Sequence, residues 1–148
     1  MKQTIIAVIC FLCVSSLYIQ AQKINHPSLL YTPQRIQQVK QRMQHEPKLQ
    51  EAWGDIKRTA DEALQKKDFN RLDYLSLAYL MTDNKEYADV IKEILLKTVE
   101  AESWGDVEMM ARIPAWRSQL GMAHKSFLSA VGYDAAYNVM SSSERKKI

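Results

Sequence analysis

The stretch that decides the fold is "LDYLSLAYLMTDNKEYADVIKEILLKTV", residues 72–99. Its first ten residues are apolar almost all round, which is typical of a helix that is buried on several sides. The polar run 82–85 follows, and apolar residues then recur at helical spacing, namely Tyr87, Val90, Ile91, Ile94, Leu95 and Val99. The pattern predicts two helices joined by a short polar turn, which is an antiparallel helical hairpin.

Two further helices are predicted upstream of this hairpin. Thr32 and Pro33 are a typical N-cap and first residue, and they begin a helix expected over residues 33–45. A second helix is expected over residues 47–66, where apolar residues continue at helical spacing. Gly54 weakens it only modestly, since one glycine costs about 1 kcal/mol in a helix interior.

Downstream, the segment 102–118 breaks the helical periodicity and is unusually apolar for a connection. A helix is then expected over residues 117–139. Its buried side is expected to hold Leu120, Ala123, Phe127, Ala130, Val131, Ala135 and Tyr137. In the final stretch "VMSSSERKKI", residues 139–148, Ser141 and Glu144 have the spacing of a capping box, which predicts the first turn of another helix. No alternating strand pattern occurs, so the fold class is all-α, built of antiparallel helical hairpins, and we expect the chain to be part of a larger helical array.

Residues 1–21 are predicted to be a secretory signal peptide. Lys2 precedes an apolar run over residues 5–14, and the small residue Ala21 stands where cleavage is expected. The apolar run is too short to span a membrane. The mature chain is therefore expected to be secreted and to cover residues 22–148, without a membrane segment.

Composition excludes several classes of site. Both cysteines, Cys10 and Cys13, lie in the predicted signal peptide, so the mature chain has no disulfide and no cysteine metal site. The residues are 47% hydrophobic and 25% charged, which is ordinary for a globular domain. The formal net charge of +3 is too small, and too evenly mixed with acidic residues, to indicate a nucleic-acid partner. It is compatible with a polyanionic ligand.

Few residues suggest catalysis. No Gly-rich phosphate loop and no Gly-x-Ser-x-Gly motif occurs, so phosphoryl transfer and serine hydrolysis have no support. His26, His45 and His124 form no metal-binding pair, and a structural or surface role is favoured for each, although His124 could face a groove. Tyr133 is a possible proton donor beside Asp134, but at its helical spacing a core role is favoured. We assign no catalytic residue, metal or cofactor.

Better candidates for function are Trp104, Trp116 and Arg117. Aromatic faces stack on sugar rings, and a guanidinium makes bidentate contacts to a carboxylate or sulfate. Connections between helices are also where binding groups tend to lie. The alternative left open is that these tryptophans fill the interface between hairpins.

Three stretches together resemble a known family. "HPSLLYTPQRIQQVKQRM" (26–43), followed by a tryptophan helix that ends in "TADEAL" (59–64), is similar to the start of the heparinase II/III-like polysaccharide lyases. "LAYLMTDNKEYADVIKEIL" (77–95) resembles the next hairpin of that family. "AWRSQLGMAHKSFLSAVGYDAAYNVMSSSERKKI" (115–148) resembles its later signature of a Trp, a helix ending in Tyr-Asp and a Ser-x-x-Glu-Arg cap. The resemblance covers about residues 25–148.

The resemblance implies that residues 22–148 are the N-terminal part of an incomplete (α/α) toroid, which β-sandwich domains follow in the family. It also implies export to the bacterial periplasm and an acidic polysaccharide partner, cleaved at uronic acids by β-elimination. The family's Asn-His pair and catalytic Tyr lie later in the toroid, and no Asn-His pair follows Trp116 here, so no catalytic role is carried over. The residues expected at most to border the substrate groove are Trp104, Trp116, Arg117 and His124.

Two other functions stay open. One is a non-enzymatic helical-hairpin repeat that binds glycans or proteins, although the second copy at a period of about 34 residues that a tetratricopeptide array needs is missing. The other is hydrolysis by paired carboxylates, for which only Asp106 and Glu108 lie close together in sequence. Five helices of a toroid would leave apolar flanks uncovered, so we expect the chain alone to be poorly soluble or oligomeric.

Overall fold

The computed structural model describes residues 24–101, 104–105, 107–114 and 119–148. The predicted signal peptide, residues 1–21, lies outside the described residues, as do Trp116 and Arg117. Within the described part of the chain every regular element is a helix and there is no strand. The predicted all-α fold class is therefore confirmed.

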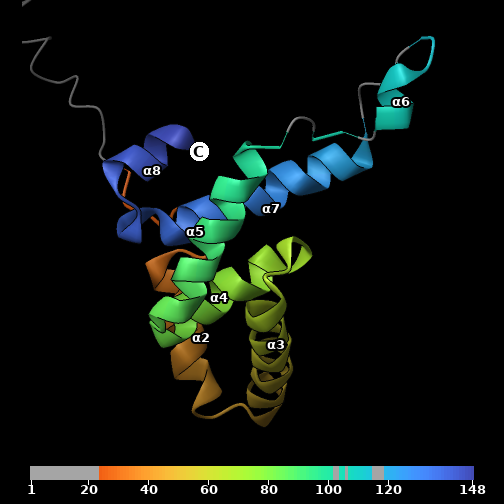
Figure 1. Ribbon diagram of the computed structural model, residues 1–148. Helices are drawn as coiled ribbons and strands as arrows, with labels where there is room; N and C mark the ends of the chain where they lie inside the picture. The colour runs from red at the N-terminus through yellow and green to blue at the C-terminus, as the bar shows by residue number, and fades with distance from the viewer. Residues whose placement is uncertain (1–23, 102–103, 106, 115–118) are drawn as a thin grey trace, which may run out of the picture.

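The helices follow the chain as shown in Figure 1. They are α2 (Pro33–Met43), α3 (Pro47–Lys66), a 3-10 turn (Phe69–Arg71), α4 (Leu72–Thr82), α5 (Lys85–Val99), α6 (Val107–Ala111), α7 (Leu120–Ala136), a 3-10 turn (Tyr137–Val139) and α8 (Ser142–Lys147). The bounds of α3 agree with those predicted, and α2 ends slightly earlier than predicted. The short helix α6 was not predicted, because it lies in the segment interpreted as an irregular connection.

Local signals in the sequence fix several helix ends. Asp83 ends α4 in the left-handed region, with a φ of 56°, and Asn84 then caps α5 by accepting a hydrogen bond from the Glu86 amide at 3.1 Å. The predicted capping box is present in α8, where the Ser141 hydroxyl accepts from the Glu144 amide and the Glu144 carboxylate accepts from the Ser141 amide.

Helix α4 lies at the centre of the core. It packs against α3, α5 and α7, and Leu72, Leu75 and Ala78 are fully buried. This burial on several sides matches its apolar sequence. The core cluster consists of Ala60, Ala63, Leu72, Leu75, Ala78, Tyr87, Ile91, Ile94, Leu95, Leu128, Ala136 and Met140.

The two halves of α7 have different surroundings. The C-terminal half crosses α4 and α5, and a β-carbon added at Gly132 would lie 3.2 Å from Cδ2 of Leu72, so glycine permits this close approach. The N-terminal half extends beyond the other helices toward α6 (Figure 1). The prediction that Leu120, Ala123, Phe127 and Ala130 are buried is wrong, because all four residues are exposed, Leu120 to 92% and Phe127 to 52%. Helical periodicity identifies an apolar face, but it does not show that another element covers it.

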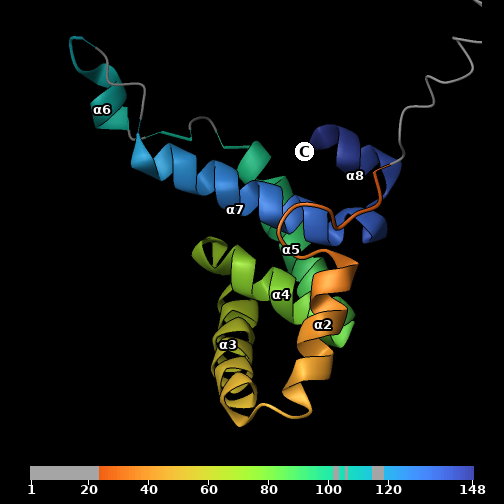
Figure 2. The same ribbon diagram turned by 180° about the vertical axis from the view of Figure 1, so that it is seen from behind.

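Helices α2 and α3 lie side by side in both views and are joined by the short link 44–46 (Figure 2). The chain then runs through the 3-10 turn over residues 69–71 into α4. None of the helices in the described ranges is long and apolar enough to cross a membrane.

Candidate functional site

A groove of about 440 Å³ lies at the C-terminal half of α5. The turn after α3, the residues that follow α5 and one residue of α7 complete its walls. We call it the lysine groove and define it by Lys67, Phe69, Asn70, Glu93, Ile94, Lys97, Thr98, Ala101, Trp104 and Lys125.

The end of α3 positions one wall of the lysine groove. Lys67 ends this helix in the left-handed region, with a φ of 52°, which turns the chain sharply. The Asp68 side chain then accepts a hydrogen bond from the Asn70 amide at 2.9 Å and begins the 3-10 turn. Lys67 Nζ lies 2.7 Å from the Glu93 carboxylate on α5, so an ion pair joins the two walls.

Positive charge dominates the described part of the lining of the lysine groove. Among the described lining residues Glu93 is the only acid, and it is paired with Lys67. Lys125 Nζ donates a hydrogen bond to the Trp104 carbonyl oxygen at 3.0 Å, and Lys97 has no ion pair among the residues that the structure describes. Within this part of the chain two positive charges thus stay uncompensated, which favours an anionic ligand.

Trp104 contributes an aromatic side chain to this positive groove. Its indole N–H donates to the Thr98 carbonyl oxygen at 3.2 Å and so ties the ring to the last turn of α5, where the same oxygen also accepts from the Ala101 amide. The side chain is partly exposed and also lines a neighbouring cavity. An aromatic ring beside ammonium groups suits a ring-shaped anion, because the ring supplies apolar contact and the lysines supply charge.

The neighbouring cavity is smaller and mostly apolar. It measures about 310 Å³ and lies between α5 and α7. The Ser129 hydroxyl in its wall is buried and has no hydrogen-bond partner among the described residues. The lining residues of the cavity are Leu95, Thr98, Val99, Trp104, Ser129, Ala130, Tyr133 and Ile148.

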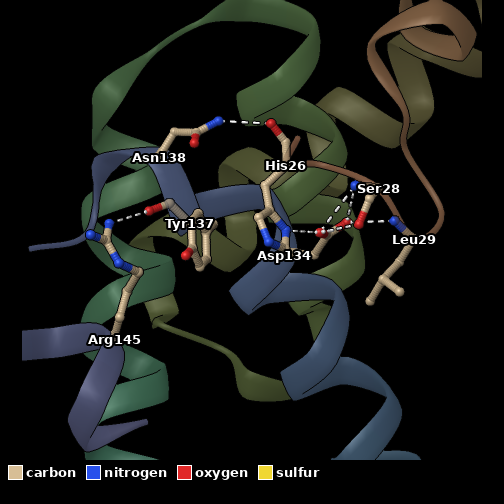
Figure 3. A network of polar contacts seen from close by, with 7 residues as sticks. All are labelled: His26, Ser28, Leu29, Asp134, Tyr137, Asn138 and Arg145. Carbon is tan, nitrogen blue, oxygen red and sulfur yellow. Dashed lines mark hydrogen bonds and ion pairs between the residues drawn. The ribbon is translucent and has the colours of Figure 1, made fainter. Parts of the chain in front are cut away.

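A second polar constellation joins the start of the described chain to α7 (Figure 3). The buried Asp134 carboxylate lies 2.5 Å from Nδ1 of His26, and only 4% of Asp134 is exposed. The same carboxylate accepts hydrogen bonds from the amides of Ser28 and Leu29, each at 2.8 Å. One side chain therefore fastens the segment 26–29 to the core.

Further contacts hold the ring and the backbone carbonyl of His26. Its ring stacks on Tyr137 with centroids 3.9 Å apart, and its carbonyl oxygen accepts from the Asn138 side chain at 2.7 Å. The Arg145 guanidinium lies 4.8 Å from the Tyr137 ring centroid and donates to the Met140 carbonyl oxygen at 2.6 Å. Stacking and charge thus connect α8 to the same constellation.

Two opposing effects act on the pKa of Asp134. Burial raises the pKa because it penalises the charged form, whereas the hydrogen bonds from Leu29, His26 and Ser28 stabilise the carboxylate and lower it. The hydrogen bonds prevail, so the pKa of Asp134 lies below its ordinary value. The carboxylate is therefore charged at neutral pH and holds its donors as an anion.

The structure separates this constellation from the lysine groove. A carboxylate that orients a histidine is also found in catalytic sites. Neither His26 nor Asp134 lines the lysine groove or the neighbouring cavity, so the arrangement does not place them beside a ligand there. Their geometry fits an anchor for the N-terminal segment, which is a structural role.

The structure describes two of the four residues predicted to bind substrate, and it places them differently. Trp104 lines the lysine groove, while His124 is exposed on α7 next to Lys125 and is not part of the groove lining. Trp116 and Arg117 lie outside the described residues. Among the residues that are described, no group of three or more His, Cys, Asp or Glu side chains could hold a metal ion.

Sequence reasoning missed the three lysines of the groove. Lys67, Lys97 and Lys125 come from three different elements, and only the packing of α7 on α5 and the turn after α3 brings them together. Each alone looks like a solvated helix lysine, so no local signal marks them. The pairing of His26 with Asp134 was also missed, although a polar residue on an apolar helix face is a usable signal.

Comparisons of this chain with models of protein families, with curated proteins and with solved structures found no match in any of the three. Its function is therefore inferred from the sequence motifs and from the geometry of the lysine groove.

Proposed function

We propose that this chain is the N-terminal part of the (α/α) toroid of a secreted lyase that cleaves uronic-acid-containing polysaccharides, and that its lysine groove contacts the acidic polymer. The observation that carries the proposal is the groove itself, in which Trp104 lies beside Lys97 and Lys125, two lysines without an ion pair among the residues that the structure describes. A uronate ring presents an apolar face and a carboxylate together. In the lysine groove, the Trp104 ring suits the apolar face, and the ammonium groups of Lys97 and Lys125 suit the carboxylate.

In β-elimination, the residues that bind the polymer have a role separate from those that transfer protons. The proton at C5 of a uronate is weakly acidic until the adjacent carboxylate is neutralised, and a base and an acid then transfer protons. Residues here bind the polymer and do not react with it, since no catalytic residue is assigned to this chain. An ammonium group engages one carboxylate of the polymer, and successive carboxylates keep the chain in register.

The arrangement of the helices supports the toroid part of the proposal. A toroid of this type is built from antiparallel hairpins, and α2 lies beside α3 while α4 and α5 are joined by a tight capped turn. The exposed apolar side chains at the start of α7 are surface that further hairpins of such an array would bury.

A titration calorimetry experiment tests the binding role. An oligouronate is expected to bind the purified chain more tightly than a neutral oligosaccharide of the same length, with affinity that falls as salt rises. Replacing both Lys97 and Lys125 by alanine is expected to weaken binding about tenfold or more, because two charge-assisted contacts are lost. Lys48→Ala is the matched control, since Lys48 is exposed at the opposite end of α3. Equal binding of the neutral sugar would contradict the proposal.

The alternative is a non-enzymatic helical-hairpin module that binds glycans. It rests on the same groove, because an aromatic ring beside ammonium groups suits an acidic glycan whether or not the glycan is then cleaved. The two proposals differ in product. A protein that carries residues 22–148 in a lyase releases unsaturated uronates, which absorb ultraviolet light, whereas the module binds the same polymers and leaves them intact.

A further inference from the structure

The apolar cavity between α5 and α7 adjoins the lysine groove. Thr98 and Trp104 belong to the lining of both, so the two hollows meet along these two residues. On α7, Lys125 lines the groove and Ser129 lines the cavity. Residues four apart lie on the same face of a helix and about 6 Å apart along its axis, so a ligand of modest length spans from one hollow to the other.

The two hollows differ in chemistry. The described lining of the apolar cavity contains no charged side chain, and Leu95, Val99 and Ile148 supply aliphatic groups. Water in such a cavity gains few hydrogen bonds, so an apolar group displaces it favourably. The adjoining groove offers the ammonium groups of Lys97 and Lys125. The two hollows together therefore fit a molecule with an apolar chain at one end and a negative charge at the other.

Trp104, at the junction of the two hollows, is held through its ring and through its backbone. Its indole N–H donates to the Thr98 carbonyl oxygen at 3.2 Å, and its own carbonyl oxygen accepts from Lys125 Nζ at 3.0 Å. These contacts order the junction before a ligand arrives, which lowers the entropy cost of binding. An ammonium group carries several donors, so the bond from Lys125 to Trp104 leaves others for a carboxylate.

We propose that the apolar cavity and the lysine groove together bind a medium-chain fatty acid such as octanoate, with its alkyl chain in the cavity and its carboxylate at Lys97 and Lys125. Their volumes, about 310 and 440 Å³, are of the size that small-molecule sites have. A uronate polymer in the groove uses the same lysines but presents no alkyl chain to the cavity. The proposal thus goes beyond the polysaccharide function, and the two can fail separately because only the fatty acid depends on the cavity.

A nitrogen-15 NMR titration with butanoate, hexanoate and octanoate, each below its micelle-forming concentration, tests the site. Octanoate is expected to shift the resonances of residues that line both hollows, the Trp104 indole N–H among them, and these shifts should saturate. Burial of one methylene raises affinity about fourfold, so each added pair of methylenes should raise it at least about tenfold. Octanol lacks the charge and should bind at least about tenfold more weakly than octanoate.

Ala130→Leu is the variant that separates the two functions, because it fills part of the cavity and leaves every lysine in place. Ala130 is exposed on α7, so the fold tolerates the larger side chain. The variant should bind octanoate at least about tenfold more weakly and oligouronate as tightly as wild type, since Ala130 is not in the described lining of the lysine groove. Ala123→Leu is the matched control. Ala123 is also exposed on α7 but lies outside both described linings, so octanoate affinity should change by less than about twofold.

Three results would each refute the fatty-acid site: an affinity that does not depend on chain length, equal binding of octanol and octanoate, or an unchanged octanoate affinity of Ala130→Leu. Vesicles of phosphatidylglycerol are the last comparison. Binding to these vesicles without binding of dissolved octanoate would assign the surface to a lipid bilayer and contradict a site for a single fatty acid.

Discussion

Replacing Asp134 by asparagine tests whether this buried carboxylate fastens the N-terminal segment to the core. The carboxylate accepts hydrogen bonds from the Ser28 and Leu29 amides and pairs with His26, and it is 4% exposed. Asparagine has the same shape but only one acceptor oxygen, and its amide group would face donors. A hydrogen bond to a charged group contributes about 1.5–3 kcal/mol, so losing two gives an expected cost of about 3–6 kcal/mol. This is a large share of the roughly 5–15 kcal/mol typical of a folded domain.

Urea unfolding followed by circular dichroism measures this cost as a difference in the free energy of unfolding. Asp89→Asn is the control, because Asp89 is 69% exposed in its pair with Lys92 and is expected to contribute below about 1 kcal/mol. A double-mutant cycle with His26→Ala should give a coupling energy above about 1 kcal/mol, since the two side chains are in contact. A cost for Asp134→Asn as small as that of the control, with no coupling to His26, would refute the anchoring role.

Three further predictions concern pH, glycine positions and association. In the folded protein the pKa of Asp134 lies below its ordinary value of 3.8, so the carboxylate stabilises the fold above that pH, and this stabilisation is lost as pH falls through the folded pKa. The difference in the free energy of unfolding between wild type and Asp134→Asn, measured with urea, should therefore shrink in acid. Gly54→Ala should stabilise the folded chain by about 0.5–1 kcal/mol, since nothing lies within 4 Å of the added carbon. Gly132→Ala should stabilise it less or destabilise it, because the added carbon would lie 3.2 Å from Leu72, and thermal melting of the two variants compares them. The chain should self-associate through exposed apolar side chains, and replacing Leu120 and Phe127 by glutamine should shift sedimentation toward monomer.

The elements whose formation depends on residues close together in the sequence were predictable from the sequence. The helices within residues 72–99 form with a turn at the predicted place, because their periodicity and the cap at Asn84 are local signals. Pro47 and the left-handed Lys67 likewise bound α3 close to the predicted range. Thr32 caps α2 as predicted and accepts a hydrogen bond from an amide of the first turn at 3.3 Å.

The features that depend on packing were not predictable in the same way. Asp134 and His26 are 108 residues apart in sequence, and nothing local indicates that they meet. The exposure of Leu120 depends on which elements cover α7, and a helical pattern reports only that one face is apolar. Trp104 was chosen for its chemistry, but it lies near Lys97 only because its indole packs against the last turn of α5.

The most direct test of the central claim is to locate an oligouronate on the chain by nitrogen-15 NMR. We predict that the resonances of the Trp104 indole N–H and of the amides of residues 67–70, 93–101 and 125 shift together, and that these shifts saturate as the oligouronate is added. A neutral oligosaccharide of equal length is expected to leave these resonances unshifted. Shifts on another surface, or equal shifts with the neutral sugar, would contradict the assignment of the lysine groove as a site for an acidic polysaccharide.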